Sequence, residues 1–425
     1  MTDRRTIDLD HHSQEYADSY HQVADELRGS GCPVAWSEHH GGFWVTPGHA
    51  DVARVARDDD YFTQDHERRE DGGGLGQGVQ RPPGPVRTLP IESHSPFTQF
   101  IRQLCGPAFS PAGAKQFEPR FLEMVTECLD AVIETGRVDF SEDLAAITTV
   151  RATMELIGLP ADRLPLYAKV SHESSYLAPG QPGFDEAMAG IGEIQSDVIG
   201  LVSERKKNPG EGGLIDRLLV GDVRGRQLSE DEVVGVLMSL ILGGGDTTAT
   251  LTLQTLRWLH HNPEHRARLL TDDAYFATAT EEFLRVFTPN VQIFRVATQD
   301  TELSGQPVRR GESVMMWWAA ANRDPAVFAD PYEVRLDRRE ANRHLSFGNG
   351  THRCLGQHIA RMEFRTMVRE VLRRMPDYQI DESAVDRYHT VKTIDGLMHL
   401  PAVFTPGSRE GGRPAAAAAA AAAVA

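Results

Sequence analysis

Cysteine is scarce in this chain. Only Cys32, Cys105, Cys128 and Cys354 occur among 425 residues, and no Cys-x-x-Cys pair is present. The spacing is too wide for a recognisable zinc knuckle, and such sparse cysteine is typical of a reducing compartment. A metal site that uses cysteine here must therefore need only one protein thiolate.

Positive charge and long apolar runs are also in short supply. The chain has 44 Lys and Arg against 61 Asp and Glu, a net charge of -17, which argues against general binding to nucleic acid or to membrane surfaces. It contains no apolar run of about 18 residues, the length that suggests a membrane span, and its N-terminus lacks the apolar segment of a signal peptide. We therefore expect a cytoplasmic protein that binds neither nucleic acid nor membrane.

A Ser/Gly/Pro-rich linker is missing as well, so we predict a single domain over residues 11–405. Residues 1–10 are predicted to be a flexible N-terminus. Residues 406–425, which end in polyalanine, are predicted to be a low-complexity tail without a catalytic role. The Gly/Pro-rich stretch 71–85 predicts a long irregular loop, of the kind that often covers a site, because helical patterns resume after it at the same density.

Helix-period apolar positions dominate the chain, so the predicted fold class is mainly α with minor β. The predicted helices cover residues 11–29, 97–107, 116–135, 143–157, 185–206, 229–260, 277–287 and 357–375. Strand signals are fewer and shorter. They fall at Phe43–Thr46, Ile293–Val296 and Ser313–Trp317, with a C-terminal pair between 377 and 404. Small sheets should therefore lie beside a helical mass.

A glycine-punctuated turn, Phe347–Gly356, presents Cys354 just before a helical pattern that starts at Gln357. A free thiol has a pKa of about 8.5, so it is mostly protonated at neutral pH unless something stabilises its anion. The unpaired N–H groups of a helix N-terminus do so, and Gly348 and Gly350 let backbone amides and a flat ligand come close. An intracellular cysteine is more often a small buried hydrophobe, but this setting favours a metal ligand.

Haem iron suits a single thiolate, because the porphyrin supplies four nitrogens and a cysteine can supply the fifth ligand. With His352 two residues before the thiol and Ala360 six after it, the turn resembles the haem-ligand loop of the cytochrome P-450 family. The resemblance implies haem b as the cofactor, with Cys354 as the ligand of its iron. The other loop residues that it places beside the cofactor are Phe347, Gly348 and Gly356.

A second informative segment is a predicted helix from Ser229 to Asn262-Pro263, about 33 residues and about 50 Å long. Ser229 and Glu232 form a capping box at its start. Its middle contains glycine at 243–245, and each glycine in a helix costs about 1 kcal/mol relative to alanine. Two explanations remain open, namely close contact with another helix and space for a bulky flat cofactor.

The same segment resembles the oxygen-binding helix of the family. The pattern Ala/Gly-Gly-x-Asp/Glu-Thr falls on Gly243, Gly244, Gly245, Asp246 and Thr247. The resemblance implies that Gly243 and Gly244 border the cofactor, that Thr247 hydrogen-bonds dioxygen or its water, and that Asp246 helps to feed protons. An aspartate on a helix is more often solvated, but Asp246 follows ten nearly apolar residues.

Downstream, Glu282 and Arg285 have the spacing of a helix ion pair, which alone is common and worth only about 0.2–0.5 kcal/mol. Their position ahead of a strand-rich stretch and of Cys354 resembles that of the family's Glu-x-x-Arg pair. The resemblance implies a structural ion pair with a third arginine. Spacing selects Arg339 for that role, with Arg338 as a close competitor.

Haem carries two propionates, and their burial requires positive or donor groups. The resemblance implies that Arg102, Arg295 and His352 are their partners. The ordinary alternatives are a solvated arginine and a histidine that satisfies a local hydrogen bond. Four more arginines, spaced by four along the helix after Cys354, form either a docking surface for an acidic electron donor or a solvated helix face.

The matches span about residues 10 to 405 and together resemble a soluble, bacterial-type cytochrome P-450 monooxygenase. The resemblance implies insertion of one atom of O2 into an apolar small molecule, such as a terpenoid, a steroid, a fatty acid or a polyketide-type compound. No flavin or NAD(P) domain is recognisable, so NAD(P)H would act only through a separate ferredoxin or flavodoxin and its reductase. We expect the enzyme to be a monomer.

Two alternatives remain at this stage. A haem-thiolate enzyme could use peroxide or rearrange its substrate without oxygen, although the intact Asp246 and Thr247 argue against both. A non-enzymatic haem sensor would need neither this pair nor an apolar pocket. By family position, the pocket walls are expected from 71–97, 165–190, Leu242–Thr248, Val291–Phe294 and Ile394–Met398.

Overall fold

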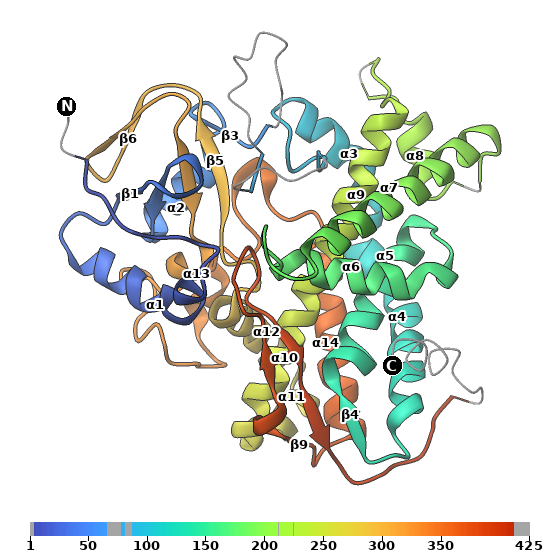
Figure 1. Cartoon of the computed structure of the whole chain (residues 1–425). Helices are drawn as coiled ribbons and strands as arrows, with labels where there is room; N and C mark the ends of the chain where they lie inside the picture. Colours follow the sequence, from blue (N-terminus) through green and yellow to red (C-terminus); the bar gives the residue numbers. More distant parts are fainter. Residues whose placement is uncertain (1–3, 66–77, 81–86, 211, 224, 412–425) are drawn as a thin grey trace.

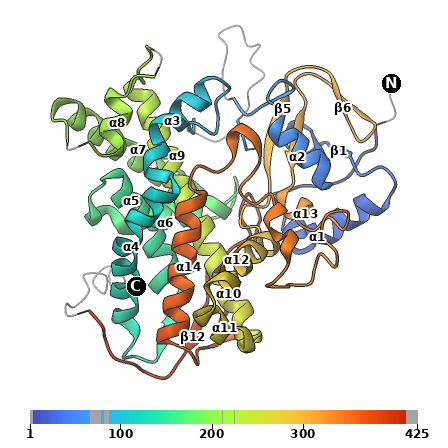
Figure 2. The same cartoon turned by 180° about the vertical axis from the view of Figure 1, so that it is seen from behind.

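The computed structural model describes residues 4–65, 78–80, 87–210, 212–223 and 225–411. Helices form the bulk of the molecule, with α4 to α9 gathered on one side and a sheet with α1 and α2 on the other (Figure 1). Helices α10, α12 and α14 lie between these two parts, and the view from behind shows the same arrangement (Figure 2). The predicted class, mainly α with minor β, is confirmed.

The largest sheet has the strand order β1-β2-β8-β5-β3. Its strands are β1 (Ala35–Ser37), β2 (Phe43–Thr46), β3 (Phe62–Thr63), β5 (Ile293–Ala297) and β8 (Ser313–Met316). Strands β2 and β8 are parallel, and the other neighbours are antiparallel. The central strands read as continuous apolar runs because both faces of the sheet are buried: Phe43 and Val45 pack toward α1 (Gln14–Gly29), and Trp44 packs toward α2 (His49–Arg57).

Three smaller sheets complete the β structure of the described residues. One has the order β4-β12-β9, with β4 (Arg137–Asp139), β9 (Gln379–Ile380) and β12 (Pro401–Val403). The other two are hairpins. They pair β6 (Thr301–Leu303) with β7 (Gln306–Val308) and β10 (Asp386–Arg387) with β11 (Leu397–His399). The predicted C-terminal strand signals therefore correspond to four short strands in two sheets.

Most predicted helices are present, with small shifts at their ends. They are α1, α3 (Phe97–Phe109), α4 (Pro111–Val132), α5 (Ala146–Ile157), α7 (Phe184–Lys207), α12 (Asp273–Phe287) and α14 (Gln357–Arg374). Helix α4 begins earlier than predicted because Ser110 caps it and Pro111 occupies its first turn. Short or weakly patterned helices were missed: α2, α6 (Leu164–Tyr176), α8 (Leu214–Val220), α11 (Arg266–Thr271) and α13 (Trp318–Ala321).

The predicted long helix over 229–260 is present, with one interruption. It consists of α9 (Glu230–Gly244) and α10 (Asp246–His261), and the break falls at Gly245, where φ is -83° and ψ is -74°. The predicted capping box is present, since Ser229 and Glu232 each accept a hydrogen bond from the other's backbone N–H. Among the described helices, Glu230–His261 is long and apolar enough to cross a membrane, but 72% of the apolar window is buried inside the fold, as in a core helix.

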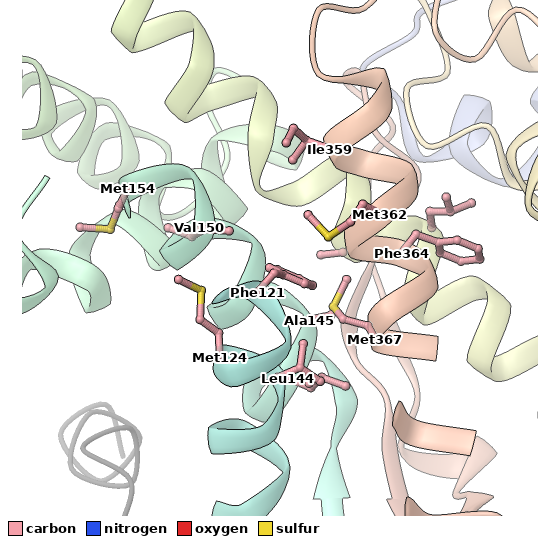
Figure 3. Close-up of a cluster of buried hydrophobic side chains, with 14 of the residues drawn as sticks. Phe121, Met124, Leu144, Ala145, Val150, Met154, Ile359, Met362, Phe364 and Met367 are labelled. Atoms are coloured by element: carbon pink, nitrogen blue, oxygen red, sulfur yellow. The ribbon is translucent and has the colours of Figure 1, made fainter. Parts of the chain in front are cut away.

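Helix α14, which follows Cys354, is held by buried side chains on two sides. Met362 and Met367 lie toward α4, where Phe121 and Met124 project (Figure 3). On its other side the ring of Phe364 lies 6.2 Å from those of Phe276 and Phe283 on α12. Full burial of such side chains contributes about 1.5–3 kcal/mol each, so the start of α14 is firmly positioned.

Both chain ends are more ordered than predicted wherever they are described. Residues 1–10 are predicted to be flexible, yet Ile7 N donates to Trp36 O and Trp36 N donates to Arg5 O, so this segment pairs with β1. In the predicted tail, Glu410 pairs with Arg373. Residues 412–425 lie outside the described residues, as does most of the predicted 71–85 loop.

Candidate active site

A cavity of about 290 Å³ lies where α3, α9, α10, β5 and the turn before α14 meet. Most predicted site residues line this cavity. They are Arg102, Gly243, Gly244, Thr247, Arg295, Phe347, Gly348, His352, Cys354 and Gly356. Much of the remaining lining is apolar, including Pro90, Ile91, Leu240, Leu251 and Ile293. Of the walls expected by family position, 165–190 and 394–398 contribute no lining residue in the described part of the chain.

The turn that carries Cys354 is built by glycine and by backbone hydrogen bonds. Gly348 and Gly350 have φ of 67° and 71°, values that favour glycine. At Gly350 a Cβ would also lie 2.8 Å from the Cα of Arg57 on α2, so no side chain fits there. Cys354 N donates to Phe347 O at 2.7 Å, which folds the turn back on itself and presents the thiol to the cavity.

Burial raises the pKa of the Cys354 thiol in the protein alone. The backbone N–H of Gly356 and the charges of Arg102 and Arg361 act in the opposite direction without cancelling the effect of burial. In the protein alone the Gly356 N–H therefore acts in the predicted direction, but burial outweighs it. A bound metal cation would deprotonate such a thiol outright, so a metal ligand is still compatible with this setting.

An ion pair between Glu281 and Arg361, which was not predicted from the sequence, stabilises the turn that carries Cys354. Glu281 on α12 accepts two hydrogen bonds from Arg361, each 2.7 Å long, and lies 3.1 Å from the His344 ring. Burial alone would raise the pKa of Glu281, but the bonds from Arg361 and His344 lower it to about 2. The Arg361 guanidinium also lies 4.4 Å from the centre of the Phe347 ring, so α12, α14 and the turn are joined.

Both explanations of the glycine run apply, each to different residues. A Cβ on Gly244 would lie 2.5 Å from Thr153 Oγ1, and one on Gly245 would lie 2.8 Å from Val150 Cγ2. These two glycines therefore permit close contact with α5. A Cβ on Gly243 would meet nothing within 4 Å, and this residue lines the cavity, so it leaves space on that side.

The predicted proton-handling residues, Asp246 and Thr247, lie in two different environments. Thr247 lines the cavity, and its hydroxyl donates to Gly243 O at 3.2 Å. Asp246 is buried but does not line the cavity. It accepts hydrogen bonds from the Tyr388 hydroxyl at 2.8 and 3.0 Å, and His172 Nδ1 lies 3.2 Å from its carboxylate. The carboxylate of Asp246 therefore joins α10 to α6, which carries His172. It also joins α10 to Tyr388, which directly follows β10 (Asp386–Arg387).

The two partners of Asp246 are titratable and largely buried. Burial and the charge of Asp246 raise the pKa of Tyr388 well above its ordinary value. Burial is the largest single effect and would lower the pKa of His172. The hydrogen bond to Asp246 and the negative charges of Asp246, Glu173 and Glu142 together outweigh it, so the pKa is raised. His172 remains 21% exposed, so this cluster reaches from the buried carboxylate to the surface.

The predicted Glu282–Arg285 pair is present, but the third arginine is Arg338. Arg285 donates to both carboxylate oxygens of Glu282 at 2.7 and 2.8 Å, and Arg338 Nε donates at 3.0 Å. The prediction of Arg339 is wrong because Arg338 N closes a turn onto Arg335 O, and a short 3-10 helix begins at Arg339. Leu336 and Arg338 are buried, whereas Arg339 is exposed.

The positive groups around the cavity fit a cofactor that carries acidic groups. Arg295 is buried on β5, and its terminal nitrogens bond to Asp59 and Gln64, among others. Its Nε is buried without a hydrogen-bond partner among the described residues, so a ligand carboxylate in the cavity would satisfy it. Arg102 makes no hydrogen bond or ion pair with the described residues. Burial and the charge of Arg295 lower the pKa of His352 to about 3, which leaves it neutral.

The arginine stripe on α14 is largely satisfied within the protein. Arg361 bonds to Glu281, and Arg365 donates to Thr280. Arg369 pairs with Asp273, and Arg373 pairs with Glu370 and Glu410. The structure therefore favours the reading of this stripe as an intramolecular feature over that of a free docking surface.

One more cavity residue was missed. Glu363, nine positions after Cys354 on α14, lines the cavity and is 2% exposed. Burial raises its pKa well above the ordinary value, which favours the protonated form of the carboxyl group. Its place in an otherwise apolar, buried helix stretch between Met362 and Phe364 is the signal that sequence analysis had available.

Comparisons with known proteins agree with this site. A sequence model described as Cytochrome P450 matches residues 188–376. The Steroid C26-monooxygenase of Mycolicibacterium smegmatis is 31% identical over 341 residues, which cover 78% of this chain and 83% of the relative. The Vitamin D(3) 25-hydroxylase of Pseudonocardia autotrophica is 30% identical over 373 residues, which cover 87% and 89%. Mycobacterium marinum cytochrome P450 CYP268A2, solved in complex with pseudoionone, is 25% identical and matches 95% of this chain and 100% of its own, with a TM-score of 0.83.

The chain therefore belongs to the cytochrome P450 family, and it is an oxidoreductase of the monooxygenase class. Membership implies haem iron as cofactor and O2 as co-substrate. In the described structure, most residues predicted to hold them line the cavity around Cys354.

Proposed function

We propose that the chain binds haem b in this cavity, with Cys354 as the ligand of its iron, and inserts one oxygen atom from O2 into an apolar small molecule. The observation that carries the proposal is that Cys354, Thr247 and Arg295 line one cavity although they come from three distant segments. Bound haem supplies the oxidising chemistry, and a thiolate ligand favours O–O cleavage. The protein's own residues hold the cofactor, exclude water and manage protons.

The groups proposed to hold the cofactor are charged or small. Arg102, Arg295 and His352 donate to the propionates, and the unpaired Nε of Arg295 supports this role. Gly243 and Gly244 border the cofactor on one side, and Phe347, Gly348 and Gly356 border it on the side of Cys354. The open space beside Gly243 supports its place next to the cofactor. Gly244 packs closely against α5, so its assignment has weaker support.

Proton supply is assigned to the groups on α10. Thr247 faces the cavity, so its hydroxyl can hydrogen-bond the oxygen substrate or a water molecule beside it. Asp246 follows the break at Gly245 and is held by Tyr388 and His172. We assign Asp246 the transfer of protons from the partly exposed His172 toward the Thr247 side of the helix, with Tyr388 as a positioning residue.

The cavity and the relatives support a proposal for the substrate class. Leu240, Leu251 and Ile293 provide apolar walls, and the described lining offers few charged groups beyond those assigned to the cofactor. The relatives include a steroid C26-monooxygenase and a vitamin D(3) 25-hydroxylase. We therefore place a steroid-like or other terpenoid skeleton first, ahead of fatty acids and polyketide-type compounds.

Electrons are proposed to come from NAD(P)H through a separate ferredoxin or flavodoxin and its reductase. The catalytic domain would comprise residues 11–405 and act as a cytoplasmic monomer. A peroxide-driven enzyme is the alternative, and comparison of donor-supported with peroxide-supported turnover separates the two. Faster product formation with peroxide than with the complete donor system would favour the alternative.

The substrate class is tested by difference spectra of the ferric haem protein with a panel of steroids, terpenoids, fatty acids and macrolides. We expect at least one steroid or terpenoid to displace the sixth ligand and shift the Soret band. Leu251→Phe, which fills the cavity wall, should weaken that binding, whereas Val220→Phe, at an exposed position outside the cavity, should not. If no apolar compound shifts the spectrum, or if a second protein side chain already occupies the iron, a haem-binding sensor is the better account.

A further inference from the structure

Imidazole and carboxylate groups gather outside the cavity, where the N-terminal segment crosses the turn between β1 and β2. Asp10, His11 and His40 each offer a ligand atom, and these atoms all lie within 4.8 Å of one another. His40 Nε2 lies 2.6 Å from Asp10 Oδ1. His12 adds a third imidazole ring, with its centroid 4.4 Å from that of His40.

The scaffold holds these groups from both sides. The N-terminal segment is fixed to β1 by Ile7 N, which donates to Trp36 O, and by Ser37 Oγ, which donates to Leu9 O. The His11 ring packs edge-on against Phe43. His40 has a φ of 51° and a ψ of 35°, a left-handed conformation that is uncommon for residues other than glycine and persists when the surroundings fix it.

Two other groups of the described chain contain similar residues, but their carboxylates are more fully engaged by other partners. In the group of His260, His261 and Glu382, the carboxylate is already engaged by Arg257. In the group of Asp139, Glu142 and His399, the Asp139 carboxylate accepts backbone N–H bonds from two chain segments. Asp10 instead receives one backbone bond, from His12 to Oδ1, and has no arginine or lysine partner among the described residues.

We propose that Asp10, His11 and His40 bind a divalent zinc-class cation, with water as the fourth ligand. Imidazole nitrogen with carboxylate oxygen is a donor set that Zn²⁺ accepts, at bond lengths of about 2.0–2.2 Å. Tetrahedral ligands at that distance lie about 3.4 Å apart. The donor atoms lie between 2.6 and 4.8 Å apart, so each pair distance needs to change by at most about 1.4 Å to reach that spacing.

The cation would join the N-terminal segment to the turn at 39–41, on the face of the large sheet that carries Phe43. This site is separate from the proposed haem cavity, and none of its three ligands lines that cavity. Its effect would therefore be on the stability of the sheet side of the molecule and not on the oxygen chemistry.

The test uses the haem-loaded protein without a histidine tag. Zn²⁺ binding is measured by competition with a chromophoric chelator, and thermal unfolding is recorded with and without Zn²⁺. We expect one Zn²⁺ per chain with a micromolar or lower dissociation constant and a higher unfolding temperature when it is bound. His40→Ala and the isosteric Asp10→Asn should each raise the dissociation constant about tenfold or more and abolish the thermal shift.

His389→Ala is the matched control, because His389 is exposed and belongs to none of the three groups. It should bind Zn²⁺ as the unaltered chain does. The proposal is overturned if the unaltered protein takes up no Zn²⁺ at micromolar concentration, or if Asp10→Asn and His40→Ala bind it as tightly as the control. Because the ligands lie outside the haem cavity, either result leaves the proposed monooxygenase function untouched.

Discussion

Glu282 shows how one buried side chain joins α12 to the segment of Arg335 and Arg338. It is fully buried and depends on Arg285, Arg338 and the backbone N–H of Arg335 for its hydrogen bonds. Removing one partner of a buried ion pair leaves a charge without compensation, which costs about 3–5 kcal/mol. The cluster therefore stabilises the fold only when every hydrogen-bond donor to Glu282 is present.

Arg338→Ala should lower the free energy of unfolding by about 3 kcal/mol or more in a urea titration, because Glu282 loses a charged donor. Arg339→Ala, the neighbouring exposed arginine, should change it by less than about 0.5 kcal/mol. Equal effects of the two substitutions would contradict the assignment of Arg338 to the cluster.

Glu281 gives a prediction about pH. Its pKa is lowered from 4.5 to about 2, so its ionised form stabilises the fold above pH 4.5, and this contribution is lost as the pH falls toward 2. The shift corresponds to about 3 kcal/mol at neutral pH. Glu281→Gln should therefore lower the stability at pH 7 and flatten its decline between pH 4.5 and 2.5, measured by urea unfolding. A decline as steep as that of the unaltered protein would count against this ion pair.

Single residues also show how far the sequence predicts the site. Cys354, Phe347 and Gly356 could be identified because their signal is local, within one turn. His172 and Tyr388 could not, since they lie 74 and 142 positions from Asp246 and meet it only in the folded chain. The choice between Arg338 and Arg339 as the partner of Glu282 depends on which of the two adjacent side chains points inward, and this is visible only in the folded chain.

Among the elements, the junction of α9 and α10 contains the most informative contrast. Gly244 packs against Thr153 of α5, whereas Gly243 borders open space in the cavity. The segment was predicted as one helix because its apolar pattern is continuous. Beside the break, Gly244 and Gly245 lie close to Thr153 and Val150 of α5, a segment about 90 positions earlier whose approach the sequence does not locate.

Gly244→Ala should destabilise the fold by about 1–3 kcal/mol, because its Cβ would collide with Thr153. Gly243→Ala should leave the stability unchanged or raise it by up to about 1 kcal/mol, since alanine is the better helix former. Thermal unfolding of the two variants provides the measurement. If Gly243→Ala proved the more destabilising of the two, the assignment of the glycines would be reversed.

Helix α6 was missed, yet it carries His172. The sequence Leu164–Tyr176 is rich in serine and lacks a clear apolar stripe, and several of its buried positions are polar, such as Ser171 and Ser175. Its burial depends on α5 and α7, which pack against it. Pattern recognition therefore fails where the buried face of a helix is polar.

Tyr388→Phe tests whether this bridge between elements positions Asp246. The loss of a hydrogen bond to a charged group is worth about 1.5–3 kcal/mol, so product formed per NAD(P)H should fall by about tenfold, with more hydrogen peroxide released. The substrate-induced spectral shift should persist, because Tyr388 does not line the cavity. Tyr176→Phe is the control: its ring lies 4.5 Å from that of Tyr388, but its hydroxyl makes no bond to Asp246. Equal coupling in Tyr388→Phe and the unaltered enzyme would exclude the positioning role.

At the scale of the whole molecule, the cavity exists only because distant parts of the chain meet. The sheet contributes Arg295, the central helices contribute Gly243 and Thr247, and the start of α14 contributes Cys354. Helix α14 lies between α4 and α12, as its buried contacts show (Figure 3). The predicted fold class and the family were correct because these anchoring motifs are local, although they are brought together by contacts that the sequence does not display.

The central claim is that Cys354 provides the thiolate of a haem in this cavity. The most direct measurement is the absorption spectrum of the reduced carbon monoxide complex, for which the family predicts a band at about 450 nm. Cys354→Ala should abolish that band, whereas Cys32→Ala, a half-buried cysteine outside the cavity, should retain it. Survival of the band in Cys354→Ala would mean that another side chain holds the iron, and the account of this site would be wrong.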